Sequence, residues 1–212
     1  MYTGLDLDYA QLDAAGRARY DIEMLLRNSG VLVYDRGSKS YTHREYISGK
    51  SYVRRVTLCG APKILKDYCI DDFKRVQRAI TAASRLRHPG IVPVECAFVA
   101  KDRHDIVVVQ SPYYSGGNMR QWCQDKDGKA RLVAAQKVAE AVRFLHAHGV
   151  LHRDLKPENI VFKGDAPDAT PALCDFDLSV STIETAERTM QRGTPLYLAP
   201  EPTPSTASDV FA

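Results

Sequence analysis

The segment VLHRDLKPENIVF, from Val150 to Phe162, places a run of charged and polar residues between two apolar ends. A strand buried in a core would show strict alternation or an unbroken apolar run instead. The pattern is typical of a polar loop that two buried flanks hold in place. We interpret the segment as a catalytic loop, and the rest of the chain must show whether it is a working loop or the remains of one.

A long amphipathic helix is expected just before this loop, because apolar residues recur three and four positions apart over 132–145. Farther upstream, the stretches 31–65 and 91–110 contain short runs with period-two character, which predict strands of a small antiparallel sheet. Residues 73–86 have helical spacing between them. The final stretch after residue 201 reads as irregular.

These elements predict an α+β fold with two lobes and three parts. We expect an N-terminal extension with helical character over 1–30, a sheet-rich lobe over 31–111, and a hinge with a mainly helical lobe over 112–212. Ligand chemistry is expected at the junction of two such lobes.

Composition narrows the function classes. The 212 residues carry 29 basic and 26 acidic side chains, a net charge of +3 with no long block of one sign, so we expect no dedicated nucleic-acid surface. The five cysteines are widely spaced without a C-x-x-C pair, which indicates reduced thiols and no zinc knuckle. We expect no membrane span and a cytoplasmic or nuclear protein, because no apolar run approaches about 18 residues.

Three motifs stand in a fixed order: HRDLKPEN at 152–159, DFD at 175–177 and APE at 199–201. Together they resemble signatures of the eukaryotic protein kinases. Lys156 and the Gly-Thr pair ahead of APE resemble the serine/threonine type. The resemblance implies a two-lobed protein-kinase-like fold that transfers the γ-phosphate of ATP to a protein hydroxyl. ATP, Mg²⁺ and a protein substrate with serine or threonine are therefore the expected partners.

The resemblance also implies roles for single residues, because phosphoryl transfer depends on positioning and on charge neutralisation. Asp154 would orient the substrate hydroxyl and accept its proton, and Lys156 would place a cation beside the γ-phosphate. Asn159 and Asp175 would supply oxygen ligands to Mg²⁺ and so help bind the cofactor. Thr194 is expected to contact both catalytic side chains.

The nucleotide-binding half departs from the family pattern. In the stretch 35–40, expected to be glycine-rich, only Gly37 is a glycine. Lys63 is the simplest choice for the nucleotide lysine, with Lys66 as a substitute if the strand is shifted. Ser111 near the gatekeeper position and Tyr113 in the hinge are expected to lie beside adenine.

Two further departures leave an alternative open. Ala79 occupies the helix position that normally carries a glutamate for the nucleotide lysine, and Asp177 replaces the glycine of DFG. We interpret Asp177 as a turn residue with an outward side chain. The alternative is a pseudokinase, a binding or scaffolding module with little phosphotransfer. For regulation, phosphate on Thr185 or Thr189 is expected to pair with Arg153.

The chain extends 11 residues past Glu201, whereas the resemblance implies several further helices there. We therefore expect a truncated kinase domain with an incomplete helical lobe. In such a fragment the apolar faces of the helix over 132–145 and of Ile160, Val161 and Phe162 would lack much of their cover. Glu201 would lack the arginine that the family supplies.

Overall fold

The computed structural model describes residues 32–33, 44–46, 53–58, 60–69, 76–78, 80–81, 86–99, 106–182, 193–201 and 203–212, with 14, 16, 17 and 21 described singly. The chain divides into two compact units. The first comprises 1–80 with 94–111, and the second comprises 81–93 with 112–212. Residues 81–93 thus group with the second unit, although the sequence analysis placed them in the sheet-rich lobe.

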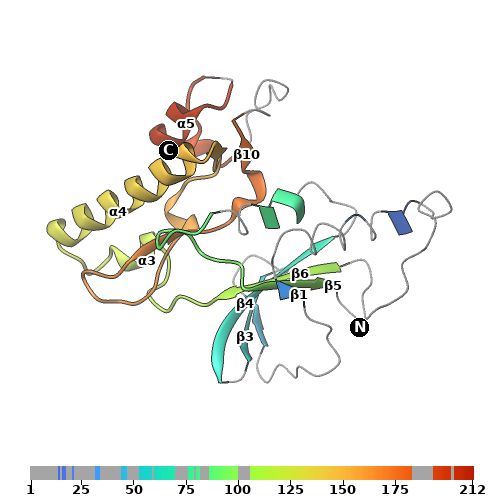
Figure 1. The fold of residues 1–212 in the computed structure, drawn as a ribbon. Helices are drawn as coiled ribbons and strands as arrows, with labels where there is room; N and C mark the ends of the chain where they lie inside the picture. The colour runs from blue at the N-terminus through green and yellow to red at the C-terminus, as the bar shows by residue number, and fades with distance from the viewer. Residues whose placement is uncertain are drawn as a thin grey trace. The chain divides into compact units, whose positions relative to one another are not determined.

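The first unit contains, among its described residues, a six-stranded sheet in the order β1-β5-β6-β4-β3-β2 (Figure 1). Its strands are β1 (Leu32–Val33), β2 (Arg44–Tyr46), β3 (Val53–Leu58), β4 (Ala61–Cys69), β5 (Cys96–Val99) and β6 (Ile106–Pro112). The registered pairs β2–β3, β3–β4 and β5–β6 are antiparallel, as the sequence predicts. Strand β1 is an exception, because it pairs in parallel with β5.

The hairpin of β3 and β4 shows why this part of the sequence forms a sheet. Leu58 pairs with Ala61 at its tip, where Gly60 adopts a φ of 76° that L-residues rarely adopt. Alternating side chains then point to opposite faces of the sheet. One face carries an apolar cluster of Val56, Leu65, Cys96, Phe98, Ile106 and Val108.

The second unit contains helices α3 (Met119–Trp122), α4 (Gly128–Ala147) and α5 (Thr206–Phe211). Its short strands form two antiparallel pairs, β7 (Val150–Leu151) with β10 (Val180–Ser181) and β8 (Ile160–Phe162) with β9 (Pro171–Leu173). Three 3₁₀ turns complete the described elements: η2 (Pro157–Asn159), η3 (Phe176–Leu178) and η5 (Pro195–Tyr197).

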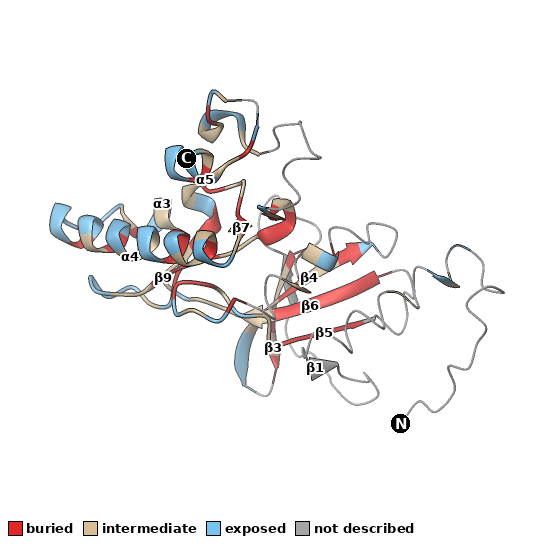
Figure 2. Ribbon diagram, turned by 45° about the horizontal axis from the view of Figure 1, so that its top comes forward, coloured by how far each residue is buried: buried red, intermediate tan, exposed pale blue. Residues whose placement is uncertain are grey.

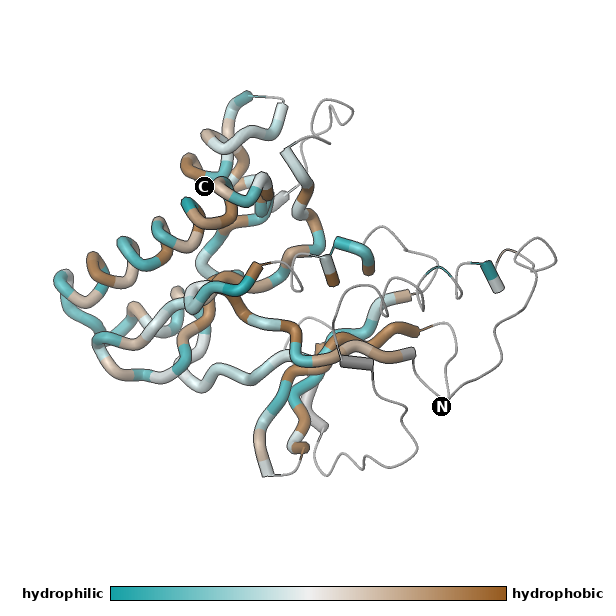
Figure 3. Tube along the Cα trace, viewed as in Figure 1, coloured by the Kyte–Doolittle hydropathy of each residue, from teal (hydrophilic) through white to brown (hydrophobic). Residues whose placement is uncertain are grey.

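Helix α4 confirms the helix predicted over 132–145 and extends it at both ends. Asp127 caps its start, because the carboxylate accepts a hydrogen bond from the Ala130 N–H at 2.7 Å. The helix ends before Gly149, whose φ of 68° suits a helix terminus. Its polar and apolar residues alternate along the tube in Figure 3, and Figure 2 shows a buried stripe along an otherwise exposed helix. The stripe consists of Ala130, Ala134, Ala141, Val142 and Leu145.

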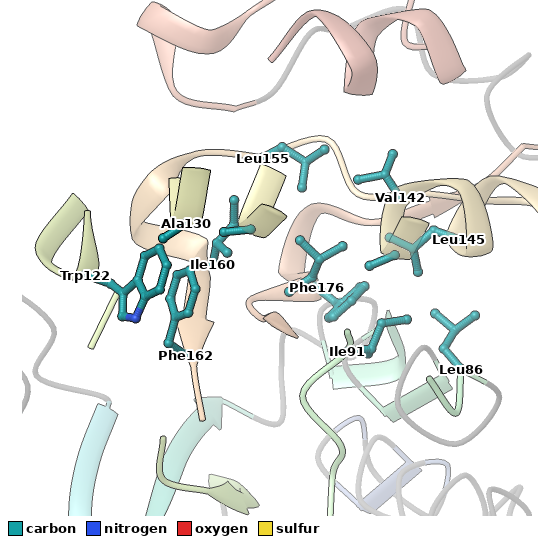
Figure 4. Close-up of a cluster of buried hydrophobic side chains, with 13 residues drawn as sticks. Leu86, Ile91, Trp122, Ala130, Val142, Leu145, Leu155, Ile160, Phe162 and Phe176 are labelled. Carbon is teal, nitrogen blue, oxygen red and sulfur yellow. The ribbon is translucent and has the colours of Figure 1, made fainter. Parts of the chain in front are cut away.

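The core of the second unit lies between α4 and the β8–β9 pair (Figure 4). Trp122 and Phe162 stack with ring centroids 4.1 Å apart and an angle of 5° between their planes. Leu86 and Ile91 belong to the same core, which explains why 81–93 groups with this unit. The expectation of missing cover is wrong for Ile160 and Phe162, which are buried. It holds for Leu132 on α4, which is 61% exposed.

Helix α5 corrects the interpretation of the final stretch as irregular. Ser205 caps the helix, since its hydroxyl accepts from the Ser208 N–H while the Ser208 hydroxyl accepts from the Ser205 N–H. Val210 and Phe211 at its end are exposed. In the part of the chain that the structure describes, no helix combines the length and apolar character needed to cross a bilayer.

Candidate active site

The polar loop is held between two short strand pairs of the second unit. Strand β7 enters the loop from its pairing with β10, and β8 leaves it paired with β9. The register Ile160↔Leu173 brings the ends of β8 and β9 together, and the Cys174 N–H donates to the Asn159 carbonyl at 2.9 Å. Asn159 and Asp175, which lie 16 residues apart in the sequence, are therefore brought to the same end of one hairpin.

Asp154 is the centre of a polar cluster on this loop. Its Oδ2 accepts from Lys156 Nζ at 2.7 Å and from Asn159 Nδ2 at 2.9 Å. Its Oδ1 accepts from the Thr194 hydroxyl at 2.8 Å and from the Thr194 N–H at 3.1 Å. Lys156 Nζ also donates to the Thr194 hydroxyl at 2.7 Å. Four donors therefore fix the orientation of one carboxylate, and the contact predicted for Thr194 is present.

Gly193 permits Thr194 to approach the loop so closely. Its φ is 149°, and a Cβ built on it would meet the Arg153 carbonyl oxygen at 2.8 Å and Leu198 Cδ2 at 2.9 Å. Contacts below 3.0 Å with backbone are not tolerated, so a larger residue would push the segment away from the loop. Gly193 thus allows the N–H and the hydroxyl of Thr194 to reach Asp154.

Asn159 and Asp175 are suited to a hard cation. Asn159 is buried, and its Nδ2 donates to the Asp154 carbonyl at 2.8 Å and to the Asp154 carboxylate at 2.9 Å. The amide oxygen Oδ1 is the acceptor atom of this side chain. Asp175 adopts a left-handed backbone with a φ of 68°, a conformation that is uncommon for non-glycine residues and recurs at functional sites. An amide oxygen and a carboxylate at one end of a hairpin are the ligand types that Mg²⁺ prefers.

Asp177 differs from its interpretation as an outward-pointing turn residue. It lies in η3 directly after Phe176, and the structure buries it. Phe176 itself packs in the core, so the 3₁₀ turn carries the neighbouring side chain inward with it. A second carboxylate near Asp175 is therefore enclosed by protein.

His152 is a neutral imidazole that is hydrogen-bonded to the catalytic loop and to the residue before Asp175. Nε2 donates to the Cys174 carbonyl at 3.0 Å, while Nδ1 accepts from the Asp154 N–H at 3.3 Å. These two bonds require one protonated and one unprotonated ring nitrogen. Complete burial lowers the pKa of His152, and the nearby Asp209 carboxylate opposes that shift. The resemblance to protein kinases implies a loop-packing role for His152, and these contacts agree with it.

Asp209 is the functional residue that sequence reasoning missed entirely. Its buried carboxylate accepts from the backbone N–H groups of His152 and Arg153, each at 2.8 Å, and contacts His146 Nε2 at 3.1 Å. It thus ties helix α5 to the start of the catalytic loop, beside the C-terminal part of α4 (Figure 1). Arg153 has a φ of 68°, so this anchor also holds a disfavoured backbone conformation. The serine pair of the capping box at 205–208 was the signal available in the sequence.

The APE glutamate, expected to lack the family's arginine, is bonded to a serine of α5. Glu201 accepts a hydrogen bond from the Ser208 hydroxyl at 2.9 Å. The same hydroxyl completes the capping box of α5, so the end of the APE motif and the start of α5 are linked.

Lys63 and Lys66 lie on opposite faces of the sheet in the first unit. In the β3–β4 register Lys63 is opposite Val56, on the face with the apolar cluster, whereas Lys66 is opposite Val53. Lys63 Nζ forms an ion pair with Glu95, whose other carboxylate oxygen accepts from Gln110 at 3.0 Å. The ammonium of Lys63 is thus already neutralised within its own unit.

The structure describes only some of the other residues that the sequence predicts at the nucleotide. Ser111 lies in the last part of β6 and Tyr113 directly follows that strand, and both are half-buried. Gly37, Ala79 and the two threonines proposed for phosphorylation, Thr185 and Thr189, lie outside the described residues. The roles given to these positions stay predictions.

Comparison with known proteins finds protein kinases, in agreement with the motifs that form this site. The model of the protein kinase domain matches residues 49–212. A bifunctional serine/threonine-protein kinase/NEDD4-like E3 ubiquitin-protein ligase of Dictyostelium discoideum is 29% identical over 87% of this chain and 10% of its own length. Serine/threonine-protein kinase 36 of Pongo abelii is 37% identical over 61% of this chain and 10% of its own. Calcium/calmodulin-dependent protein kinase type IV of Homo sapiens is 34% identical over 66% of this chain and 29% of its own length. The chain thus spans less than a third of each relative.

Proposed function

Because the chain belongs to the protein kinase family, we propose that it is a serine/threonine kinase that transfers the γ-phosphoryl group of ATP to a protein hydroxyl. The observation that carries the proposal is the fixed Asp154 carboxylate, with a cation and a hydroxyl beside it. The relatives named as serine/threonine kinases support the same acceptor class.

In this proposal the loop residues act by positioning and electrostatics. Asp154 accepts a hydrogen bond from the substrate hydroxyl, orients its oxygen toward phosphorus and takes up its proton as the new O–P bond forms. Lys156 places its ammonium against the oxygens of the transferred group while the bond to the leaving ADP oxygen breaks. The Thr194 hydroxyl holds the side chains of Asp154 and Lys156 in position by hydrogen bonds to both.

Asn159 and Asp175 are the residues that would hold Mg²⁺. Held by these residues, Mg²⁺ would neutralise charge on the ATP phosphates. The protein supplies the ligand orientation: the Asn159 amide is fixed by Asp154, and the Asp175 backbone is held in its left-handed conformation at the end of β9.

Lys63 stays our choice for the nucleotide lysine, as the sequence suggests. Its ammonium forms an ion pair with Glu95, and a kinase lysine that meets the α- and β-phosphates is normally held by such a carboxylate. Lys66, on the other face of the sheet, is the alternative.

A transfer assay with γ-labelled ATP and generic basic and acidic protein substrates tests the proposal. We expect Mg²⁺-dependent incorporation that phosphoamino-acid analysis assigns to serine and threonine. Lys63→Ala should weaken ATP binding measured by calorimetry, whereas the matched variant Lys66→Ala should not. Nucleotide binding without any transfer would contradict the kinase proposal and favour the scaffolding alternative.

A further inference from the structure

A cluster of three polar side chains lies beside the catalytic loop and takes no part in the reaction described above. Arg120 of α3 donates through Nε to Glu158 Oε1 at 2.7 Å and through Nη2 to the Tyr197 hydroxyl at 3.2 Å. The Arg120 and Glu158 side chains are 61% and 41% exposed, respectively. The cluster therefore forms part of the surface of the second unit, where an approaching protein can touch it.

The position of this cluster relates it to the substrate. Glu158 follows Asp154 by four residues and directly precedes Asn159, which binds Asp154. Tyr197 follows Thr194 by three residues, and Thr194 also binds Asp154. Four residues of extended chain span at most about 14 Å. A peptide that presents its hydroxyl to Asp154 thus has neighbouring residues within reach of Glu158.

Glu158 is the carboxylate that could select a basic substrate. Between His152 and Phe162 the acidic residues are Asp154 and Glu158, and Asp154 is already bound by Lys156 and Thr194. An exposed carboxylate this close to the acceptor site would normally attract lysine or arginine. Here Arg120 neutralises it: the hydrogen bond between them lowers the pKa of Glu158 and raises the pKa of Arg120.

Resting on the kinase function proposed above, we propose that Arg120 is a specificity-determining residue. It binds Glu158 in the place of a basic substrate residue, so lysine or arginine beside the acceptor hydroxyl gives no gain in binding. The substrate class is therefore a serine- or threonine-bearing segment without a basic requirement near the acceptor.

The physical reason is competition for one carboxylate. A substrate arginine would have to displace an intramolecular partner that is already held at hydrogen-bond distance, and it would gain no new ion pair. Removing the Arg120 guanidinium releases the Glu158 carboxylate and makes the surface more acidic by one charge. An exposed ion pair is worth about two- to fivefold in an equilibrium constant.

The test measures binding of fluorescent serine peptides that are neutral except for one arginine placed at successive positions around the acceptor. In the parent protein, the dissociation constants of arginine and alanine peptides should agree within a factor of about 1.5. Arg120→Ala and Arg120→Gln should favour arginine two- to fivefold at one or two positions, and the added change Glu158→Gln should abolish the gain. Lys129→Ala, which removes another exposed cation nearby in the sequence, is the matched control and should show no gain.

Thermal unfolding confirms that the variants fold, which the exposure of Arg120 leads us to expect. A parent protein that already prefers arginine, or variants that show no gain at any position, would overturn the inference. Absence of binding by every peptide would overturn it too, because the surface would then not contact substrate. Turnover on the same peptides is measured in parallel: selective binding without transfer would refute the kinase function alone.

Discussion

Replacing Asp209 with alanine tests how the catalytic loop is held. The Asp209 carboxylate is buried and accepts the backbone N–H groups of His152 and Arg153, both at 2.8 Å. Asp209→Ala removes the acceptor of both bonds at once and leaves the His152 N–H in the interior. Arg153, with its φ of 68°, also loses the contact that holds this conformation.

The magnitude follows from these two bonds. Hydrogen bonds to a charged group contribute about 1.5–3 kcal/mol each, and a buried donor left unpaired costs about 1–3 kcal/mol. Two bonds therefore predict a loss of roughly 3–6 kcal/mol in the free energy of unfolding. That loss is large against a typical net stability of about 5–15 kcal/mol. Asp209→Asn keeps one oxygen acceptor in place and should lose about half as much.

Urea unfolding followed by circular dichroism measures the change, with transfer activity recorded on the same samples. Val210→Ala is the matched control on the same helix, because Val210 is 74% exposed. It should change stability by less than about 0.5 kcal/mol. An Asp209→Ala variant as stable and as active as the Val210→Ala control would refute the anchoring role of Asp209.

Three further predictions concern the site and the core. Thr194→Val, which removes the hydroxyl bonded to Asp154 and Lys156, should lower kcat at least about tenfold in steady-state kinetics, whereas Thr194→Ser should not. Burial lowers the pKa of His152, so the unfolded state binds the proton more readily than the folded state. The free energy of unfolding should therefore fall as the pH drops below about 6.5 toward the folded-state pKa. Thermal unfolding at a series of pH values should show this dependence in the parent protein and not in His152→Gln. Phe162→Ala should cost about 3–5 kcal/mol in urea unfolding and Leu132→Ala, at a position 61% exposed, less than about 0.5 kcal/mol; equal losses would contradict the packing in Figure 4.

The parts of the fold with a strong repeating pattern could be predicted from the sequence. Helix α4 follows from apolar residues at three- and four-residue spacing, and β3 and β4 from period-two runs with a glycine turn between them. The central residues of the loop were predicted as well, because the motif carries its own spacing. Asp154, Lys156 and Asn159 do meet in one cluster with Thr194.

The remaining features depend on tertiary contacts that no local pattern encodes. Helix α5 has only six residues, too few for an amphipathic period, and the burial of Asp209 follows from its partners 56 and 57 residues away. The faces of Lys63 and Lys66 depend on the register of β3 against β4. Asp177 is buried because the turn that contains it packs on the core, which a turn propensity does not predict.

The catalytic role of the loop is tested most directly by a single-turnover measurement of phosphate transfer by Asp154→Asn beside the parent protein. The variant preserves the size of the side chain and the acceptor for Thr194, but it cannot take up the hydroxyl proton. We expect a rate lower by about 10²- to 10⁴-fold with ATP affinity nearly unchanged. Equal transfer rates for the variant and the parent would contradict the claim that this loop performs the reaction.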